Sequence, residues 1–578
     1  MDIFSFLRRR KKIPQVWSKY YTKEELNIKI PNISMYDQVK KSAYLYPEYY
    51  AYEYMGKKEI YKNFIDEINE WAKVFTKSGI KSGDIVTITL PNIPNVLISL
   101  YALNKIGAIA NMVHPMSSEE EILFSLTSTK SKYLIMLDTF YSKVENIIDK
   151  SNVEKVIFAK VQDYMPTLTK TIYNLSIIGK YKKIPKRDNF YTWKSFYQKY
   201  KTSETMKFPK FDSYTPAVII HSGGTSGKPK NVVIQNRAFI LGALQENIMM
   251  KNLFPGDCCL AIMPNFHGFG LSVLMHTPLA LGCYTILIPK FDSKKFDIMF
   301  KKKKPSCVLG VPTLYEALMS NNNVKNLDLS NLKYIVSGGD ILTKSLENKM
   351  NKYLKEHNSP GKITQGYGLS EALAAVTLAC DDINKSGSVG IPLPGNQIKI
   401  IDPATRETLP YGEIGEICVH SKAFMQGYLN DESETNTALQ VHKDGHVWLH
   451  TGDLGYMDED GFLFYKGRLK RMIVSSGYNV YPSHVEEVIE SHPAVLQCTV
   501  VGVPHPYKQE VPKAFIVLKD GYFPIFVKDD IKEYCKKKLS KYMIPQEFVF
   551  RKRLPRTKLG KVDFNSLIND TRGDDDDD

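Results

Sequence analysis

The chain has few cysteines, and they follow no disulfide or metal-binding pattern. Eight occur among 578 residues, and none forms a CxxC pair or a zinc-type spacing. This argues against a disulfide framework and against a structural zinc site. We expect buried, reduced thiols, with the adjacent Cys258 and Cys259 pointing to opposite faces of one strand.

The sequence also lacks a long, uninterrupted hydrophobic run. Its most apolar window, residues 271–289, contains His276, Pro278 and Gly282, which is typical of a core helix followed by a strand rather than of a membrane span. No apolar stretch follows the charges of the N-terminal MDIFSFLRRRKKIP, so a cleavable signal is not indicated. Residues 1–34 are interpreted as an N-terminal basic extension. For its short basic and aromatic opening, residues 1–14, we favour a frayed terminus over a weak peripheral membrane contact. We expect a cytoplasmic protein, at most peripheral to a membrane.

Acidic residues are outnumbered by basic ones, and the formal net charge is +15. The lysines are spread along the whole chain, and no recognisable nucleic-acid-binding motif accompanies them. We therefore expect a solvated basic surface and no nucleic-acid partner. Residues 571–578 end in consecutive aspartates and are interpreted as an acidic tail.

Helix and strand patterns alternate along most of the chain. Helices are expected near Tyr61–Lys77 and Asn95–Ile106, and strands at Ile85–Leu90 and Tyr133–Leu137. Residues 163–212 are interpreted as an elaborated connection. Further strands are expected at Cys258–Met263, Cys307–Gly310 and Tyr334–Val336. This alternation predicts a parallel or mixed sheet covered by helices.

Two further units are expected towards the C-terminus. Glycine and proline at 389–395, before short strands at 397–401 and 416–420, predict a small barrel or β-rich subdomain. After Arg468 the pattern indicates a compact α+β unit of about a hundred residues. Its elements are expected near 483–491, 498–503, 514–518 and 530–539.

Residues 221–231, HSGGTSGKPKN, follow an apolar β-branched run and combine three glycines with hydroxyl groups and two lysines. Glycine lets backbone N–H groups converge on an anionic oxygen, so the loop suits a polyphosphate. A P-loop is excluded, because Ser222 and Pro229 stand where that motif needs Gly and then Ser or Thr. A solvated Gly/Ser linker is the structural alternative.

Residues 365–371, QGYGLSE, carry groups suited to a nucleotide. Tyr367 offers a flat face to a purine, Ser370 a phosphate donor, and Glu371 a hard oxygen ligand for Mg²⁺. The alternative is a plain strand-to-helix turn with Tyr367 in the core. Upstream, Gly338 and Gly339 would let an adenine approach the backbone.

Other candidates are weaker when taken alone. A carboxylate such as Asp453, in WLHTGD, can accept both hydroxyl hydrogens of a ribose, with Arg468 nearby to assist. Asp340 either contacts the base or caps the helix that starts near Thr343, and the cap is favoured. His267, in PNFHG, borders a substrate or is a satisfied core histidine. Residues 555–561, PRTKLGK, read by composition as an exposed basic loop.

In order and spacing, these motifs resemble those of the adenylate-forming superfamily, which includes acyl-CoA synthetases, luciferase and adenylation domains, and fatty-acid and 4-coumarate CoA ligases are the nearest branch. The resemblance covers nearly the whole chain. The family usually has Gly where this chain has Asn231, and often Ala at Asp340. The implied fold is α/β, with a large N-terminal domain of β/α layers plus a small β-rich subdomain (35–468) and a smaller, mobile α+β C-terminal domain (469–570).

The resemblance implies an ATP-dependent acid–CoA ligase that uses Mg²⁺. A carboxylic acid, expected to be a fatty acid, would form acyl-AMP with release of pyrophosphate, and CoA would then displace AMP. The alternatives are an acyl-AMP ligase that loads a carrier protein, and a catalytically silent nucleotide- or acyl-binding homologue.

The resemblance also assigns roles to residues. The catalytic residues would be Lys561, His267 and Glu371, the hinge Lys470, and the metal ligands Thr225 and Glu371. CoA would contact Ser476, Gly477 and Tyr478. ATP and AMP would contact Ser222, Gly223, Gly224, Thr225, Ser226, Gly227, Lys230, Gly338, Gly339, Gln365, Gly366, Tyr367, Gly368, Ser370, Asp453, Tyr465 and Arg468. The acyl pocket is expected among residues 267–274, 311–315 and 365–373.

Overall fold

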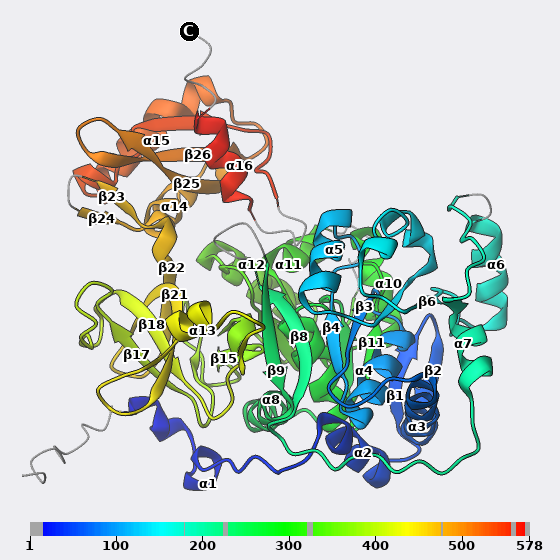
Figure 1. Ribbon diagram of the computed structural model, residues 1–578. Helices are drawn as coiled ribbons and strands as arrows, with labels where there is room; N and C mark the ends of the chain where they lie inside the picture. The colour runs from blue at the N-terminus through cyan, green and yellow to red at the C-terminus, as the bar shows by residue number, and fades with distance from the viewer. Residues whose placement is uncertain are drawn as a thin grey trace, which may run out of the picture.

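Four β-sheets and their helices make up the part of the chain that the computed structural model describes, residues 15–177, 180–222, 229–320, 327–475, 478–556 and 562–572. Two large sheets form most of the N-terminal domain, with a small β-rich subdomain beside them (Figure 1). The fourth sheet lies in a smaller C-terminal domain, which is coloured orange to red. The predicted α/β fold class is confirmed.

One large sheet has eight strands and includes the strand that leads into the glycine-rich loop. Its order is β19 (Gly427–Tyr428), β9 (Lys230–Gln235), β8 (Pro216–Ser222), β4 (Ile109–Met112), β3 (Ile85–Thr89), β5 (Tyr133–Leu137), β6 (Lys155–Ala159) and β7 (Phe190–Thr192). Neighbours from β8 to β7 run parallel, whereas β9 is antiparallel to β8 and to β19. β5 is buried along its whole length, as expected of a parallel strand covered on both faces.

The other large sheet has nine strands. Its order is β16 (Ile391–Pro392), β15 (Ala375–Leu378), β14 (Ile363–Gly368), β13 (Tyr334–Ser337), β12 (Cys307–Gly310), β10 (Cys258–Ala261), β11 (Tyr284–Leu287), β1 (Tyr50–Tyr54) and β2 (Lys57–Ile60). The strands from β14 to β1 run parallel, and the outer pairs are antiparallel. Parallel strands bring their carboxyl ends to one edge, which gathers the residues that follow β13 and β14.

Two helices connect the large sheets. α4 (Pro94–Ile106) contacts β4 of one sheet, and α3 (Tyr61–Ser78) contacts both α4 and strands β1 and β2 of the other. α4 is buried nearly all round, as an apolar helix between two sheets should be. The large domain also contains α1 (Lys23–Leu26), α2 (Met35–Leu45), α5 (Glu119–Ser128), α6 (Thr167–Ile177), α7 (Trp193–Tyr200), α8 (Asn236–Met249), α9 (Thr277–Ala280), α10 (Phe296–Lys303), α11 (Pro312–Met319), α12 (Lys344–Glu356) and α13 (Glu432–Ala438).

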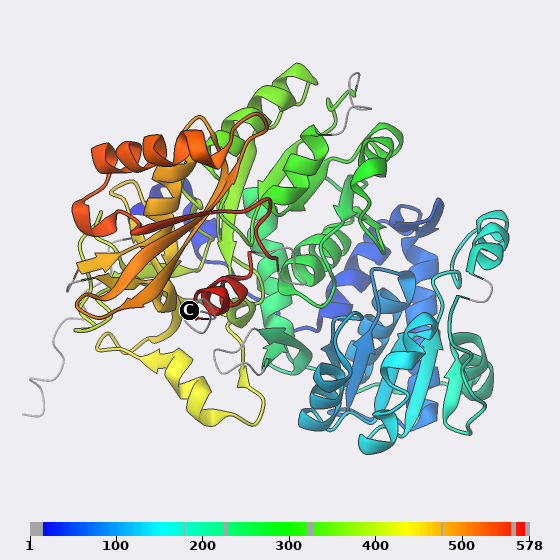
Figure 2. The same cartoon turned by 90° about the horizontal axis from the view of Figure 1, so that it is seen from above.

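Two smaller sheets follow in the chain. The β-rich subdomain has β17 (Gln397–Ile401), β18 (Gly415–His420), β21 (Val447–Met457) and β20 (Leu439–Val441), with β22 (Leu463–Arg468) paired to β21. The C-terminal domain has β24 (Tyr478–Val480), β23 (Ile473–Ser475), β26 (Gln509–Leu518), β25 (Val495–His505) and β27 (Glu547–Phe550), with α14 (Pro482–Glu490), α15 (Pro524–Lys538) and α16 (Phe564–Arg572). Seen from above, this domain lies on the side of the molecule away from α6 and α7 (Figure 2).

Several expectations about the elements can be checked. The helices α3 and α4 lie where they were predicted, whereas α15 begins at Pro524 rather than near Asp530, because proline is tolerated in a first helical turn. The connection 163–212 contains α6, β7 and α7. All eight cysteines are free and buried, and Cys258 and Cys259 join different core clusters, so they point to opposite faces of β10 as expected.

Residues 1–14, for which a frayed terminus was predicted, lie outside the described residues, whereas residues 15–34 pack on the large domain. Trp17 is buried against Gly461, and the Tyr21 hydroxyl donates to the carbonyl of Pro392 at 2.9 Å. Aromatic side chains therefore dock this segment on the large domain. Among the described residues, no helix combines the length and the apolar character that crossing a membrane requires.

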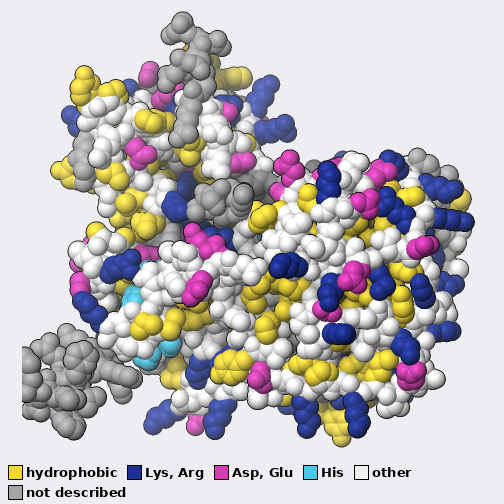
Figure 3. All heavy atoms as spheres, in the orientation of Figure 1, with side chains coloured by type: hydrophobic (Ala, Val, Ile, Leu, Met, Phe, Trp, Pro, Cys, Tyr) yellow, Lys and Arg dark blue, Asp and Glu magenta, His cyan; other side chains and the backbone are white. Residues whose placement is uncertain are grey.

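Charged side chains of both signs are interspersed over the face shown in Figure 3. The histidines visible on that face lie over the β-rich subdomain. Lys and Arg are spread along the sequence as well, which fits a solvated basic surface.

Candidate active site

A buried carboxylate on β21 is the centre of the candidate site. Asp453 is 2% exposed, and its Oδ2 accepts a hydrogen bond of 2.6 Å from the hydroxyl of Tyr367. Its Oδ1 lies 2.9 Å from Nε of Arg468. The carboxylate thus has a neutral donor on one side and a cation on the other, both held by regular strands.

Strand pairing explains why these residues meet. Asp453 and Arg468 are direct partners across the antiparallel pair β21–β22, although fifteen positions separate them in the chain. The charge of Asp453 raises the pKa of Arg468, which keeps the guanidinium charged. Burial and the same carboxylate hold the pKa of Tyr367 well above its usual range, so this hydroxyl remains a donor.

The strand before Asp453 has a bulge at Gly452, which is fixed by hydrogen bonds from the neighbouring strand β18. The N–H of Gly452 donates to Oε1 of Glu416 at 3.1 Å, and Thr451 Oγ1 donates to the carbonyl of Ile417 at 2.7 Å. Gly452 has φ +65°, a left-handed conformation that favours glycine. The TGD sequence therefore makes a local turn of the backbone within β21 that presents the aspartate.

A group of metal-ligand type lies behind this turn. Donor atoms of Glu416, Cys418 and His450 lie within 4.8 Å of one another. However, His450 Nδ1 is 3.0 Å from Glu416 Oε2, and its Nε2 is 2.9 Å from His442 Nε2. Because both ring nitrogens are engaged, we interpret this group as support for the Gly452 turn.

Glycines of β14 and of the segment after β13 lie close to one another. A Cβ at Gly338 would be 3.5 Å from the carbonyl of Gly366 and from the ring of Phe269, and Gly339 has φ +76°. Gln365 accepts from the N–H of Leu342 at 3.4 Å, which ties β14 to the segment after β13. Tyr465 lies beside Tyr367, with ring centroids 6.0 Å apart.

The expected helix cap at Asp340 is wrong. Thr343 is the N-cap of α12, and its hydroxyl accepts from the N–H of Leu346. Asp340 accepts instead from the N–H of Ile341, next to it in the chain. Burial is the main cause that raises the pKa values of Tyr465 and Glu486, and the charge of Asp340 contributes to both.

Glu371 is connected to the base of the glycine-rich loop through Tyr428, which the sequence analysis did not single out. The Tyr428 hydroxyl donates to Glu371 Oε1 at 2.9 Å. Lys230 Nζ lies 4.5 Å from the Tyr428 ring centroid and also pairs with Glu434 on α13. A Gly-Tyr dipeptide is too common to have been recognised, so only the fold identifies this contact.

The two strands that flank the glycine-rich loop, β8 and β9, pair directly with one another. Ser222 is paired with Lys230, and His221 with Asn231, across β8–β9. His221 Nε2 is 2.9 Å from Asn111 Oδ1, and burial lowers the His221 pKa to about 4, so the imidazole is neutral at pH 7. Asn231 donates to Ser128 Oγ at 2.9 Å, which gives the departure from the family's glycine a structural role.

A strained turn follows Glu371. Leu373 has φ +67° and ψ −48°, and the N–H of Ala374 donates to the carbonyl of Ala372 at 2.9 Å, which closes a γ-turn of the rare kind. A Cβ at Gly268 would lie 1.5 Å from the carbonyl of Leu373, so the His267–Gly268 segment can approach this turn only because it carries glycine. His267 Nδ1 accepts from the N–H of Phe269 at 3.2 Å.

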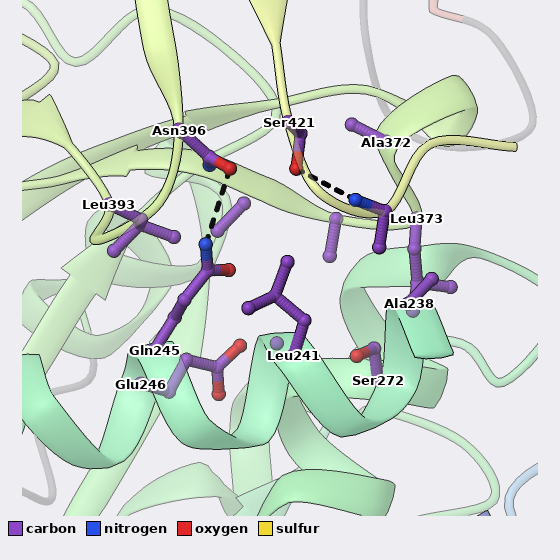
Figure 4. A pocket seen from close by; sticks show the side chains of 14 residues that line it. Ala238, Leu241, Gln245, Glu246, Ser272, Ala372, Leu373, Leu393, Asn396 and Ser421 are labelled. Carbon is purple, nitrogen blue, oxygen red and sulfur yellow. Dashed lines mark hydrogen bonds between the residues drawn. The ribbon is translucent and has the colours of Figure 1, made fainter. Parts of the chain in front are cut away.

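A small cavity lies beside this turn, against α8. It is lined by Ala238, Leu241, Gly242, Gln245, Glu246, Ser272, Ala372, Leu373, Ala374, Ala375, Leu393, Asn396, Ser421 and Ala423, most of which are labelled in Figure 4. Its volume of about 20 Å³ suffices for about one water molecule. Ser272, Ala372 and Leu373 fall in the predicted acyl-pocket segments, whereas α8 was not predicted to contribute.

The C-terminal domain approaches the candidate site through α14. Glu486 on α14 pairs with Arg471 at 2.9 Å, and Glu487 lies 3.8 Å from Lys344 at the start of α12. Burial raises the pKa of Glu316 on α11, and the charge of Arg556 acts against that shift, so Arg556 of the C-terminal domain lies near α11. Lys470 is exposed in a short helix, Leu469–Arg471, directly after β22.

Several predicted site residues are not placed. Gly223, Gly224, Thr225, Ser226, Gly227, Ser476, Gly477 and Lys561 lie outside the described residues. Tyr478 is 57% exposed and stacks on Tyr542 with ring centroids 4.6 Å apart. Gly368 and Ser370 lie at the end of β14 and in the turn that follows it.

Comparisons with known proteins agree with this geometry. The family model described as "AMP-binding enzyme" matches residues 39–429, and "AMP-binding enzyme C-terminal domain" matches residues 484–561. Over 541 residues the chain is 34% identical to the long-chain-fatty-acid–CoA ligase of Bacillus subtilis (strain 168), covering 92% of this chain and 94% of that protein. It is 28% identical to the 4-coumarate–CoA ligase of Vanilla planifolia, covering 84% of each.

The fold likeness extends to solved structures. The anthranilate CoA ligase AuaEII, in complex with anthranoyl-AMP, matches with a TM-score of 0.81 at 21% identity, covering 96% of this chain and 99% of that one. The resemblance to the adenylate-forming superfamily is thereby confirmed in both sequence and fold. The first family model matches more than half of the length of this chain. The chain therefore belongs to the AMP-binding enzyme family.

Proposed function

We propose that this chain is an ATP-dependent, AMP-forming acid–CoA ligase, with a fatty acid as its acid substrate. The observation that carries the proposal is the buried Asp453 carboxylate, held between Tyr367 and Arg468. A fixed, ionised carboxylate is suited to accept the two hydroxyl hydrogens of a ribose. Relatives named CoA ligases, such as that of Bacillus subtilis, support the choice of thiol and of a fatty acid.

In the first half-reaction, an oxygen of the acid attacks the α-phosphorus of ATP, and pyrophosphate leaves. We assign Lys561 to the charge that develops between the two anions, and Ser222, Lys230 and the loop between them to the phosphates. His267 would border the acid carboxylate, next to the γ-turn at Leu373. The adenine would lie along Gly338–Gly339 and Tyr367.

Mg²⁺ fits the donors at Glu371. A half-buried carboxylate, oriented by Tyr428, is the type of oxygen ligand that this ion prefers. We assign Glu371 and Thr225 to holding it, where it would neutralise charge on the phosphates.

In the second half-reaction, a thiol attacks the acyl carbonyl carbon and AMP leaves with its electron pair. We assign Ser476, Gly477 and Tyr478 to CoA, and Lys470 to the hinge between an adenylation domain of residues 35–468 and a mobile domain of residues 469–570. The position of Lys470, exposed directly after β22, supports that hinge.

Three parts of the proposal go beyond what membership of the family implies. A carrier protein could replace CoA as the thiol acceptor. The protein is proposed to be cytoplasmic, with at most peripheral contact with a membrane. Acyl-group selection is assigned to the cavity beside α8.

The test is acid-dependent pyrophosphate release from ATP across acids from acetate to long-chain fatty acids and hydroxycinnamates, with and without CoA. Selective release that CoA accelerates, with an acyl-CoA product, is the expected result. Release without any thioester would favour a carrier-protein acceptor. Absence of release with every acid, while ATP still binds, would overturn the proposal in favour of a silent homologue.

A further inference from the structure

The cavity beside α8 contains polar atoms that the protein leaves without hydrogen bonds. Glu246 is 2% exposed, and its Oε2 has no partner with hydrogen-bond geometry among the described residues, although the hydroxyl of Thr277, itself without such a partner, is near enough to lower its pKa. The hydroxyl of Ser272, which is 1% exposed, also has no such partner among the described residues. Both residues line the cavity, and Figure 4 shows them opposite one another, with Leu241 between them in that view.

The other polar groups around the cavity are partnered. Gln245, next to Glu246, donates to the carbonyl of Pro394 at 2.8 Å and to Oδ1 of Asn396 at 3.2 Å. Asn396 in turn donates to the carbonyl of Val376, and Ser421 accepts from the N–H of Ala423. The polar atoms of the cavity wall that have no hydrogen-bond partner, Glu246 Oε2 and Ser272 Oγ, therefore lie where α8 faces the π-helix η5 (Phe269–His276).

Buried polar groups in folded proteins nearly always have a partner, because an unpaired one costs free energy. Among the described residues, no hydrogen bond that meets the distance and angle criteria uses Glu246 Oε2 or Ser272 Oγ. Gly242 of α8 leaves room for Ser272, whose Oγ would lie 3.5 Å from a Cβ at that position. A leucine and an alanine would fill these positions without cost in a purely apolar pocket. The pair is therefore best explained by a ligand group that enters the cavity.

The cavity lies beside the reacting centre of the proposed function. Its wall, residues 372–375, begins directly after Glu371, and the Leu373 carbonyl contacts Gly268 next to His267. An acyl chain whose carboxylate lies at His267 would thus meet the cavity. Because the free volume is about 20 Å³, Leu241 and its neighbours must shift to admit a chain, and a single polar group fits without such a shift.

We propose that Glu246 and Ser272 form a hydrogen-bonding site for a hydroxyl group carried on the acyl chain, so that the preferred substrate is a hydroxy acid rather than an unsubstituted fatty acid. This proposal rests on the proposed function. Burial raises the Glu246 pKa to about 8, so the side chain is a neutral acid at pH 7 that donates and accepts. A hydroxyl group complements such a neutral pair, whereas an ammonium group would require an ionised carboxylate.

The test compares saturated fatty acids with their hydroxylated isomers, from the 3-position to the chain end, and with ω-amino acids of equal length. With the full chain, ATP and CoA, kcat/KM for one hydroxyl isomer should exceed that of the parent acid by about tenfold or more. Equal or better turnover of the parent acid at every length would overturn the proposal. A preference for the amino acid would overturn it too.

Variants separate recognition from folding. Ser272→Ala and Glu246→Leu should remove the preference by lowering kcat/KM for the hydroxy acid while leaving or raising that of the parent, and Glu246→Gln should retain much of it. Ser176→Ala is the matched control, since this exposed serine on α6 lies outside the cavity and its hydroxyl donates to the carbonyl of Tyr173, and it should leave the preference unchanged. An equal loss for both acids in Ser272→Ala and Glu246→Gln would indicate a structural role and contradict the proposal.

Direct binding distinguishes failure of this inference from failure of the proposed function. Calorimetric titration of the unmodified chain with parent and hydroxy acids requires no turnover. Tighter binding of the hydroxy acid, even without thioester formation, would support the site and count against the ligase. Equal binding of both acids by an active ligase would remove the site and leave the ligase intact.

Discussion

The two sides of the candidate site differ in how their polar groups are satisfied. On the nucleotide side, Asp453 has partners at both oxygens, and the turn that presents it is fixed by Glu416. On the acyl side, Glu246 and Ser272 are buried without partners at Oε2 and Oγ. Under the proposed function, the nucleotide site would be preorganised by the protein, whereas the acyl site would be completed by its ligand.

Replacing Lys561 should have the largest effect, because it acts where the two sides meet. Lys561→Ala should lower the rate of acyl-AMP formation by about two to three powers of ten, through loss of one preorganised charge. Thioester formation from supplied acyl-adenylate should be spared, and rapid-quench assays of each half-reaction measure the difference. Lys552→Ala, an exposed lysine of the same domain, is the control. An equal loss in both half-reactions would remove Lys561 from the first step.

Asp453→Asn should weaken the binding of ATP without weakening the binding of the fatty acid. The change leaves Arg468 without its counter-charge and removes an acceptor for the ribose, so ATP affinity should fall about 10- to 100-fold. Fatty-acid binding should stay within about twofold, as measured by calorimetry for each ligand. Asp460→Asn, an exposed carboxylate on the following turn, should change neither. Parallel loss of both ligands would show that the two sides are one cooperative unit.

Glu246→Gln should change how the free energy of unfolding depends on pH, which tests whether the buried carboxyl of Glu246 is neutral in the folded chain. Burial raises the Glu246 pKa from 4.5 to about 8, so between these values the unfolded chain binds fewer protons and native stability falls as the pH rises. At about 1.4 kcal/mol per pKa unit, the cost reaches about 3 kcal/mol at pH 7. Glutamine does not titrate. The free energy of unfolding of the variant, measured with denaturant, should therefore rise relative to that of the wild type from pH 5 to pH 8.

The exposed Glu154→Gln variant is the control for that series. A constant difference between wild type and Glu246→Gln across the pH range would mean that Glu246 is already ionised in the folded chain. A charged carboxylate of that kind would also contradict the neutral hydroxyl site.

Tyr428→Phe should have the smallest effect. It removes one hydrogen bond to a half-buried carboxylate and keeps the ring under Lys230, so we expect a loss of about 1 kcal/mol, or about fivefold in apparent Mg²⁺ affinity. A titration of activity with Mg²⁺ measures it, with Tyr522→Phe as control. A change in KM for the fatty acid and not for Mg²⁺ would reassign Glu371 to the acyl side.

The residues proposed to bind the nucleotide could be selected from the sequence more readily than the cavity beside α8, for physical reasons. Phosphate and ribose recognition needs glycine, hydroxyl and carboxylate groups in short motifs, and these can be read one residue at a time. That Asp453 and Arg468 are cross-strand partners depended on the register of β21 and β22, which the motifs do not contain.

Recognition on the acyl side depends on which helix faces which loop. Glu246 is a single acid in an otherwise unremarkable helix, and only its position opposite Ser272 gives it significance. Asp340 was misread for a related reason, because Thr343, three residues later, offered the better cap. Tyr428 reaches Glu371 through the pairing of β19 with β9, which connects distant parts of the chain.

The most direct test of the central claim is ATP–pyrophosphate exchange, measured with the wild-type chain in the presence and absence of a fatty acid. The proposed function predicts that exchange requires the acid. Added CoA should convert the intermediate to acyl-CoA and AMP, and Asp453→Asn should suppress exchange. Exchange that proceeds without any acid, or ATP binding without exchange for every acid offered, would contradict the assignment of this site to acid–CoA ligation.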